Sequence, residues 1–257
     1  MVFLDPVFNP VFQPLLNYSP LLTLLALSFI ISLLITLVYK YFTNQDEMKR
    51  LKEQQKEFQK KMKDLRSNPN EMMKVQKEAM KANLEYMKHS FKSTLITLIP
   101  IIIIFSWMNA HLAYEPIYPE ETYSVTALFR EGAAGEAELV ADEGTELLSA
   151  AKQEINGAVR GDLTWDLKST AGEHILSVKA GKEKQVKNVL ITKKMEYAEP
   201  FAEFQHSDIQ RITINYNKLK PFGSSFSLFG WYPGWLAAYI VFSIAFSLGL
   251  RKIMNVY

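Results

Sequence analysis

Three stretches of this sequence are too long and too apolar to belong to an ordinary soluble core. Residues 21–39, 93–114 and 231–250 contain no Asp, Glu, Lys or Arg. At about 1.5 Å per residue, a helix of this length crosses a hydrocarbon layer roughly 30 Å thick. The sequence therefore predicts a membrane α-helical protein with three transmembrane helices.

The first stretch has one alternative interpretation, a cleaved signal peptide. That interpretation needs a basic N-terminal region and a small-residue cleavage site. The preceding residues instead include Asp5 and lack Lys and Arg, and the stretch runs directly into Lys40. A retained span is therefore favoured. Before it, residues 3–16 repeat Pro-Val-Phe and are expected to form an apolar, proline-broken segment on the outer membrane surface.

The distribution of charge predicts the orientation. Residues 40–92 hold fourteen Lys and Arg against eight Asp and Glu, a balance of +6, whereas residues 113–230 hold thirteen against eighteen, a balance of −5. Arg251 and Lys252 follow the third stretch. Because basic residues concentrate on cytoplasmic flanks, we expect a multi-pass protein of the cell membrane with its N-terminus outside and its C-terminus in the cytosol.

These features predict an order of segments along the chain. The expected segments are an outer-surface N-terminal segment (1–20), a first span (21–42), a cytosolic coiled-coil hairpin (43–92), a second span (93–114), an extracytoplasmic β domain (115–222), and a third span with a short cytosolic tail (223–257).

The charged segment between the first two spans has the pattern of a helical hairpin. Its first half repeats apolar side chains with the 3-4 spacing of a coiled-coil seam, at Met48, Leu51, Gln55, Phe58, Met62 and Leu65. Asn68 suits the N-cap of a second helix, Pro69 its first position, and Glu71 a capping box. The second helix is expected to carry one apolar face, made of Met73, Met80, Leu84, Met87 and Phe91.

Methionines are concentrated in this hairpin, and two interpretations of them stay open. They can fill the seam between the helices, or they can hold varied apolar partners, for which a flexible side chain is suited. On the second interpretation, the substrate-capture residues are Met48, Leu51, Phe58, Met62, Met72, Met73, Met80 and Met87. The basic surface is either solvated charge or a site of attraction to anionic lipid or ribosomal RNA.

Hydroxyl side chains recur within the spans at intervals close to one helical turn. In the predicted orientation most of them lie in the cytosolic half of the membrane, where three such rows can line a hydrophilic groove. Serine and threonine also serve as packing groups between membrane helices, so both roles stay open. The candidate groove residues are Ser28, Ser32, Thr36, Lys40, Lys92, Ser93, Thr94, Thr97, Ser243, Ser247 and Arg251.

Residues 115–222 show short alternating runs separated by turn residues, which is typical of a β-sandwich. The expected class is an all-β, immunoglobulin-like sandwich with Trp165 in its core. The six expected strands are 123–129, 136–140, 163–167, 174–178, 188–192 and 210–216. No catalytic constellation is apparent there, and we expect no enzyme activity, cofactor or metal. The chain has no cysteine, and its four histidines (His89, His111, His174 and His206) are expected at surfaces or interfaces.

The order of a span, a charged hairpin containing Asn68-Pro69-Asn70-Glu71-Met72-Met73 and two further spans resembles the archaeal YidC-like proteins. These belong to the Oxa/YidC superfamily, with the third subunit of the eukaryotic ER membrane protein complex. The resemblance covers residues 1–112 and 226–257. It implies an insertase whose groove opens to the cytosol and receives the polar flank of a substrate, while the hairpin approaches the ribosome or captures the incoming segment. The sequence departs from bacterial members, which carry a groove arginine, because no charge lies deep in its spans; its outer domain is also larger.

We therefore expect a protein that inserts hydrophobic segments of nascent membrane proteins into the bilayer. The expected partners are those segments, the lipid bilayer, the ribosome or its RNA through the basic hairpin, and an unknown ligand of the outer domain. An extracellular binding module or assembly scaffold anchored by three spans is one alternative, and its function would survive exchange of the spans. An ion-conducting pore is another, and it would conduct in planar bilayers.

Overall fold

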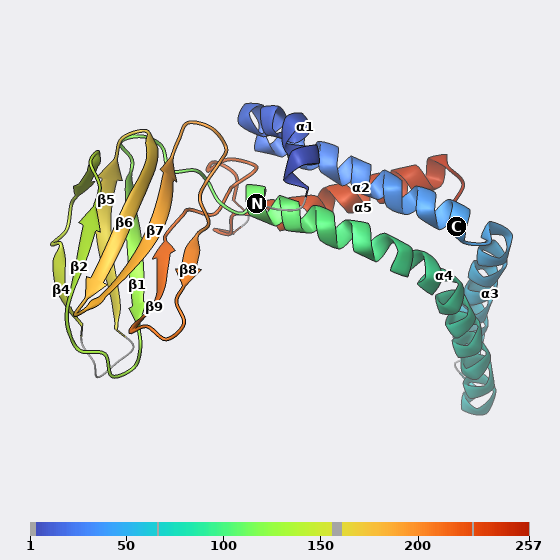
Figure 1. Ribbon diagram of the computed structural model, residues 1–257. Helices are drawn as coiled ribbons and strands as arrows, with labels where there is room; N and C mark the ends of the chain where they lie inside the picture. Colours follow the sequence, from blue (N-terminus) through green and yellow to red (C-terminus); the bar gives the residue numbers. More distant parts are fainter. Residues whose placement is uncertain (1–3, 66, 156–160, 228, 257) are drawn as a thin grey trace. The chain divides into compact units, whose positions relative to one another are not determined.

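The computed structural model describes residues 4–65, 67–155, 161–227 and 229–256 (Figure 1). The chain forms two compact units. The helical unit contains residues 1–10, 19–107 and 235–257, and the β unit contains residues 11–18 and 108–234.

Three helical segments have the length and hydropathy of membrane spans, as the sequence predicts. They are α2 (Pro20–Phe42), the final part of α4 (Pro69–Leu112) from Ser93 onward, and α5 (Trp235–Ile253). Ser19 caps α2 by accepting a hydrogen bond from Leu22 N at 3.4 Å. The third span begins at Trp235 and not at the expected Trp231, because Pro233 and Gly234 stand before it and both disfavour a helix interior.

The N-terminal segment corrects one expectation, since it is helical and not broken by its prolines. Helix α1 runs from Asp5 to Tyr18 and includes Pro10 and Pro14. A proline removes one hydrogen bond to the carbonyl four residues earlier. Because these prolines are four residues apart, the missing bonds fall on one side of the helix and the rest of its ladder is kept.

The hairpin consists of α3 (Gln45–Asp64) and the first half of α4, lying side by side (Figure 1). Asn68 caps α4 as predicted, with its Oδ1 accepting from Glu71 N at 3.5 Å. Across the hairpin, Gln55 Nε2 donates to Asn83 Oδ1 at 3.2 Å. On α3, Met48 and Leu51 are fully buried, and the other members of the predicted seam that the structure describes are half-buried.

The expected apolar face of the second helix is present, but it is not the face that packs against α3. The buried and half-buried positions of α4 in the hairpin are Met72, Val75, Ala79, Ala82 and Tyr86, again with 3-4 spacing. The side chains of Met73, Met80, Leu84, Met87 and Phe91 are exposed. We call the first set the α4 seam and the second set the outer stripe. The small residues of the α4 seam let α3 approach closely. A pattern search based on bulky apolar side chains does not detect them.

Helix α4 changes direction between its hairpin half and its spanning half (Figure 1). A cluster of hydroxyls lies between these halves and bonds to carbonyls one turn earlier. Ser90 Oγ donates to Tyr86 O at 3.0 Å, Thr94 Oγ1 to Ser90 O at 3.1 Å, and Thr97 Oγ1 to Ser93 O at 3.1 Å. Such back-bonding favours a bend in a helix, and the helix itself is continuous from Pro69 to Leu112.

The β unit is built from two antiparallel sheets of short strands. One has the order β3-β5-β1-β9-β8 and the other the order β4-β2-β6-β7. The strands are β1 (Thr122–Phe129), β2 (Gly135–Ala141), β3 (Thr145–Leu147), β4 (Lys152–Ile155), β5 (Asp162–Ser169), β6 (Gly172–Ala180), β7 (Glu183–Ile191), β8 (Phe201–Glu203) and β9 (Ile209–Ile214). All six predicted strands are present, and the three additional ones have only three or four residues.

A single hydrophobic core joins the two sheets, which confirms the sandwich class and the core position of Trp165. Trp165 on β5 is fully buried, and its Nε1 donates to Ala151 O at 3.0 Å. The topology is not that of an immunoglobulin domain, where the first strand lies at a sheet edge. Here β1 lies between β5 and β9 and pairs with both. Strand alternation predicts which residues face the core but not which strands pair.

The expectation that His174 lies at a surface or interface is wrong, because this residue of β6 is buried in the β unit. Its Nδ1 lies 3.0 Å from Asp142 Oδ1 and its Nε2 lies 2.9 Å from Thr170 O. The other oxygen of Asp142 accepts from Ile175 N at 2.8 Å. These contacts satisfy both ring nitrogens and the carboxylate. The cluster therefore has a structural role, since it connects the turn at Asp142 to β6.

Candidate functional site

The hydroxyl row of α2 lies on the face that packs against the other spans. Ser28, Ser32 and Thr36 are all buried. Ser32 Oγ donates to Ser243 O of α5 at 3.4 Å, and Thr36 Oγ1 donates to Ser32 O at 2.7 Å. Ser28 Oγ is buried without a hydrogen-bond partner among the described residues. Part of this row therefore joins helices, which is the packing role that the sequence left open.

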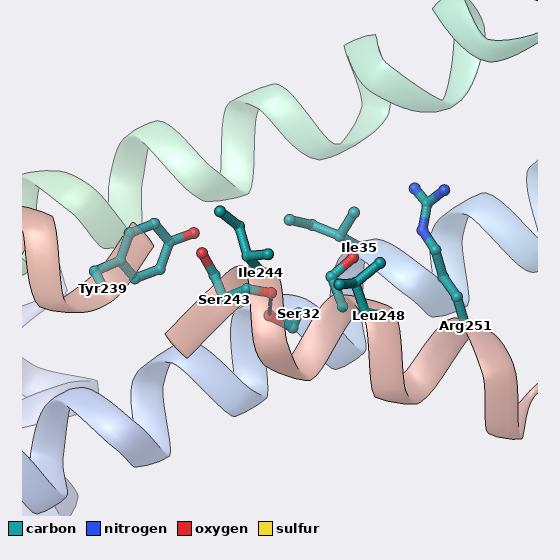
Figure 2. A pocket seen from close by; sticks show the side chains of 8 residues that line it. Ser32, Ile35, Tyr239, Ser243, Ile244, Leu248 and Arg251 are labelled. Atoms are coloured by element: carbon teal, nitrogen blue, oxygen red, sulfur yellow. Dashed lines mark hydrogen bonds between the residues drawn. The ribbon is translucent and has the colours of Figure 1, made fainter. Parts of the chain in front are cut away.

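A cavity of about 390 Å³ opens beside this contact, between α2 and α5 (Figure 2). Figure 2 shows Tyr239 at one end of the row of lining side chains and Arg251 at the other. The lining residues are Ser32, Ile35, Tyr239, Ser243, Ile244, Ser247, Leu248 and Arg251. Three serines, a tyrosine and a guanidinium thus face a space bounded otherwise by aliphatic side chains.

A second cavity of about 240 Å³ lies between α2 and α4 and shares Ile35 and Arg251 with the first. Its wall is richer in polar groups, because α4 contributes its hydroxyl cluster there. The lining residues are Ile35, Tyr39, Tyr86, Ser90, Ser93, Thr94, Thr97 and Arg251. We call the two cavities together the groove, since the shared residues make them neighbours and all three spans contribute to them.

Arg251 is the charged group of the groove. It lies in the last turn of α5, and its guanidinium carbon is 4.9 Å from the centroid of the Tyr39 ring. The hydroxyl of Tyr39 lies 3.4 Å from the hydroxyls of both Tyr86 and Ser90. Stacking on an aromatic ring holds a guanidinium without neutralising its charge. A positive charge therefore does line the groove, although it comes from the end of a span and not from its middle.

The structure brings most of the predicted groove residues together. Ser32, Ser243, Ser247 and Arg251 line one cavity, and Ser93, Thr94, Thr97 and Arg251 line the other. Ser28, Thr36 and Lys40 line neither, and the side chain of Lys92 lies outside the described residues.

Four polar lining residues escaped the sequence reasoning: Tyr39, Tyr86, Ser90 and Tyr239. Ser90 could have been predicted from the sequence, because it precedes Ser93 and Thr94 by about one turn on the same helix. The tyrosines carry no such signal, since aromatic residues are also common at membrane interfaces.

The predicted capture residues of the hairpin divide into two groups. Met48 and Leu51 are fully buried, and Phe58, Met62 and Met72 are half-buried between the helices. Met73, Met80 and Met87 are exposed members of the outer stripe. Only the second group is available to a partner while the hairpin stays closed.

Comparison with known protein families finds a similarity for the first half of the chain. A family model described as "Integral membrane protein EMC3/TMCO1-like" matches residues 5–128. Comparisons with curated proteins and with solved structures find no match. The matched residues contain α1, α2, the hairpin, the second span and most of β1. They include most of the segments that carried the resemblance in the sequence, but not the third span. Residues 5–128 are therefore similar to the EMC3/TMCO1-like family of integral membrane proteins, which belongs to the Oxa1/YidC/EMC3 superfamily.

Proposed function

We propose that the protein inserts hydrophobic segments of nascent membrane proteins into the bilayer, and that the groove receives their polar flanks. The observation that carries this proposal is the pair of neighbouring cavities among three candidate spans, lined by hydroxyls and by Arg251. A family whose superfamily includes insertases supports it.

The physical requirement on such a protein is modest. An apolar segment gains about 25 cal/mol per Å² when it leaves water for lipid. Insertion is opposed by the polar flank, since each unsatisfied polar group in hydrocarbon costs several kcal/mol. A groove with hydroxyls and one cation supplies partners along part of that path. The barrier then falls without any coupled chemical reaction.

The proposal includes an orientation in which the hairpin and Arg251 lie on the cytosolic side. The basic balance of residues 40–92 and the Arg251-Lys252 pair support it through the preference of basic residues for the cytoplasm. We also propose that the hairpin is a short antiparallel coiled coil, since α3 and the α4 seam both show 3-4 spacing.

Cysteine labelling tests the orientation, and the absence of native cysteine makes it specific. We expect Asn70→Cys, in the first turn of α4 and exposed, to react with an impermeant maleimide only after the membrane is opened. Ala171→Cys, in the exposed turn before β6, should react in intact cells. Labelling of position 70 in intact cells would reverse the orientation and remove the groove from the cytosolic side.

Site-specific photocrosslinking tests the function directly. A photoreactive residue at position 94 or 247, both in the groove, should crosslink to the flank of a ribosome-bound nascent membrane segment. Matched positions 98 and 241 are exposed on α4 and α5 and line neither cavity, so they should crosslink mainly to lipid. Equal crosslinking to the nascent chain from both pairs would contradict a role for the groove.

A further inference from the structure

The outer stripe is an apolar face that no other part of the described helical unit covers. Its five side chains, Met73, Met80, Leu84, Met87 and Phe91, are each between 51% and 62% exposed. At 3.6 residues per turn they fall on one narrow face of α4, away from the α4 seam. These side chains therefore do not contribute to the packing of the two hairpin helices.

The stripe continues without interruption into the membrane-spanning half of the same helix. Leu95, Leu98 and Ile102 carry on its spacing and are exposed as well. In that half the packed face of α4 is marked by the buried Ser93 and Thr97, so the exposed face is the one that meets lipid. One continuous apolar face thus joins the hairpin to the lipid-facing surface of the second span.

Lysines run along one edge of the stripe. Lys74, Lys81 and Lys88 each follow a stripe methionine by one position, so they lie about 100° further around the helix. The acidic Glu78 and Glu85 lie beyond this lysine row and not within it. An apolar face with a basic border is the pattern of helices that lie in a membrane interface, where lysine stems cover apolar surface and their heads reach phosphates.

The bend in α4 places this face toward the bilayer. The hairpin turns away from α2 and α5 where it leaves the spans (Figure 1). The exposed face of α4 also points away from α2 and α5, since its buried face packs toward them. The outer stripe therefore lies on the inner side of the bend, and α3 lies on the side away from the membrane.

We propose that the outer stripe docks the hairpin onto an anionic phospholipid surface, with its apolar side chains at the level of the acyl-chain boundary. The hairpin then lies along the membrane and does not project from it. The basic outer face of α3, with Lys49, Lys56 and Lys63, stays in water. This proposal rests on the hairpin and the bend of α4 and does not depend on the insertase function.

The depth of the stripe is measured on the full-length protein in nanodiscs. Met80→Cys and Lys60→Cys each carry one environment-sensitive fluorophore; position 60 is exposed on α3 and outside its seam. In discs containing phosphatidylglycerol, we expect blue-shifted emission and quenching by lipid-borne nitroxide at position 80, and aqueous emission with efficient iodide quenching at position 60. Equal iodide quenching at both positions would overturn the proposal.

A charge series separates lipid docking from other occupants. Replacing Lys74, Lys81 and Lys88 by Gln should weaken docking about a hundredfold at low ionic strength, because each lysine near an anionic surface contributes about fivefold. The matched variant Lys49, Lys56 and Lys63→Gln has the same charge change and should leave the label at position 80 buried. If position 80 is aqueous in anionic discs and becomes protected only when a hydrophobic nascent segment is added, the stripe is a substrate surface and the lipid proposal fails.

Discussion

Removing three groove hydroxyls should slow insertion selectively while the protein stays folded. The variant is Thr94→Val, Ser243→Ala and Ser247→Ala, whose side chains line the two cavities. Without these hydroxyls, the free-energy barrier to insertion of a charged translocated flank should rise by about 1–2 kcal/mol. This increase corresponds to roughly tenfold slower insertion of such substrates. Substrates with a short neutral flank should be nearly unaffected, because they need no such partners. The measurement is the initial rate of insertion into proteoliposomes for the two substrate classes.

A matched variant separates the groove from helix packing. Thr23→Val, Ser28→Ala and Thr36→Val removes three buried hydroxyls of α2 that line neither cavity. Its stability is expected to change by up to about 0.6 kcal/mol per site, and the ratio of rates for the two substrate classes should stay that of the wild type. Equal slowing of both classes by the groove variant would show that its hydroxyls act only as packing groups.

Replacing Arg251 by Gln should change insertion according to the sign of the flank. A unit charge about 5 Å from the guanidinium interacts with it by about 3 kcal/mol at an effective dielectric constant near 20. Solvent in the groove reduces this value, so we expect insertion of acidic flanks to slow by about ten- to a hundredfold and that of basic flanks to accelerate. Raising the salt concentration should diminish both effects.

Two controls make the arginine prediction specific. Arg251→Lys keeps the charge but loses the contact of the guanidinium with the Tyr39 ring, so it should retain the preference for acidic flanks with a lower stability. Lys252→Gln removes the adjacent positive charge, which is exposed and lines neither cavity, and should leave the preference unchanged. If Lys252→Gln and Arg251→Gln behave alike, the effect is one of net charge at the membrane surface and not of the groove.

The sequence predicts the helical part of this fold well because its signals are local. Length and hydropathy locate the spans, and capping chemistry locates the start of α4 at Asn68 and Pro69. The sequence did not identify the face of α4 that packs against α3, since bulky Met73 and Met80 give a stronger periodic signal than Val75 and Ala79. Small residues pack closely between helices, but they stand out little in a pattern of hydrophobicity.

Local sequence patterns do not predict contacts between residues that are far apart in the chain. The pairing of β1 with both β5 and β9, the stacking of Arg251 on Tyr39 and the burial of His174 each join residues far apart in the chain. The groove was predicted in part because its hydroxyls recur along single helices. Its tyrosines were not predicted, because Tyr39, Tyr86 and Tyr239 lie on three different helices and show no pattern along any one of them.

The β unit follows α4 and precedes α5 along the chain, and this order affects the timing of assembly. About 120 residues separate the end of α4 from the start of α5. At roughly 5–20 residues per second, the ribosome reaches the start of α5 about 6–25 s after it completes α4. During this interval α2 stands in the bilayer without the helix that supplies Arg251 and the acceptor for Ser32. A chain that inserts while it is being synthesised therefore passes through a two-span stage, in which the groove still lacks α5.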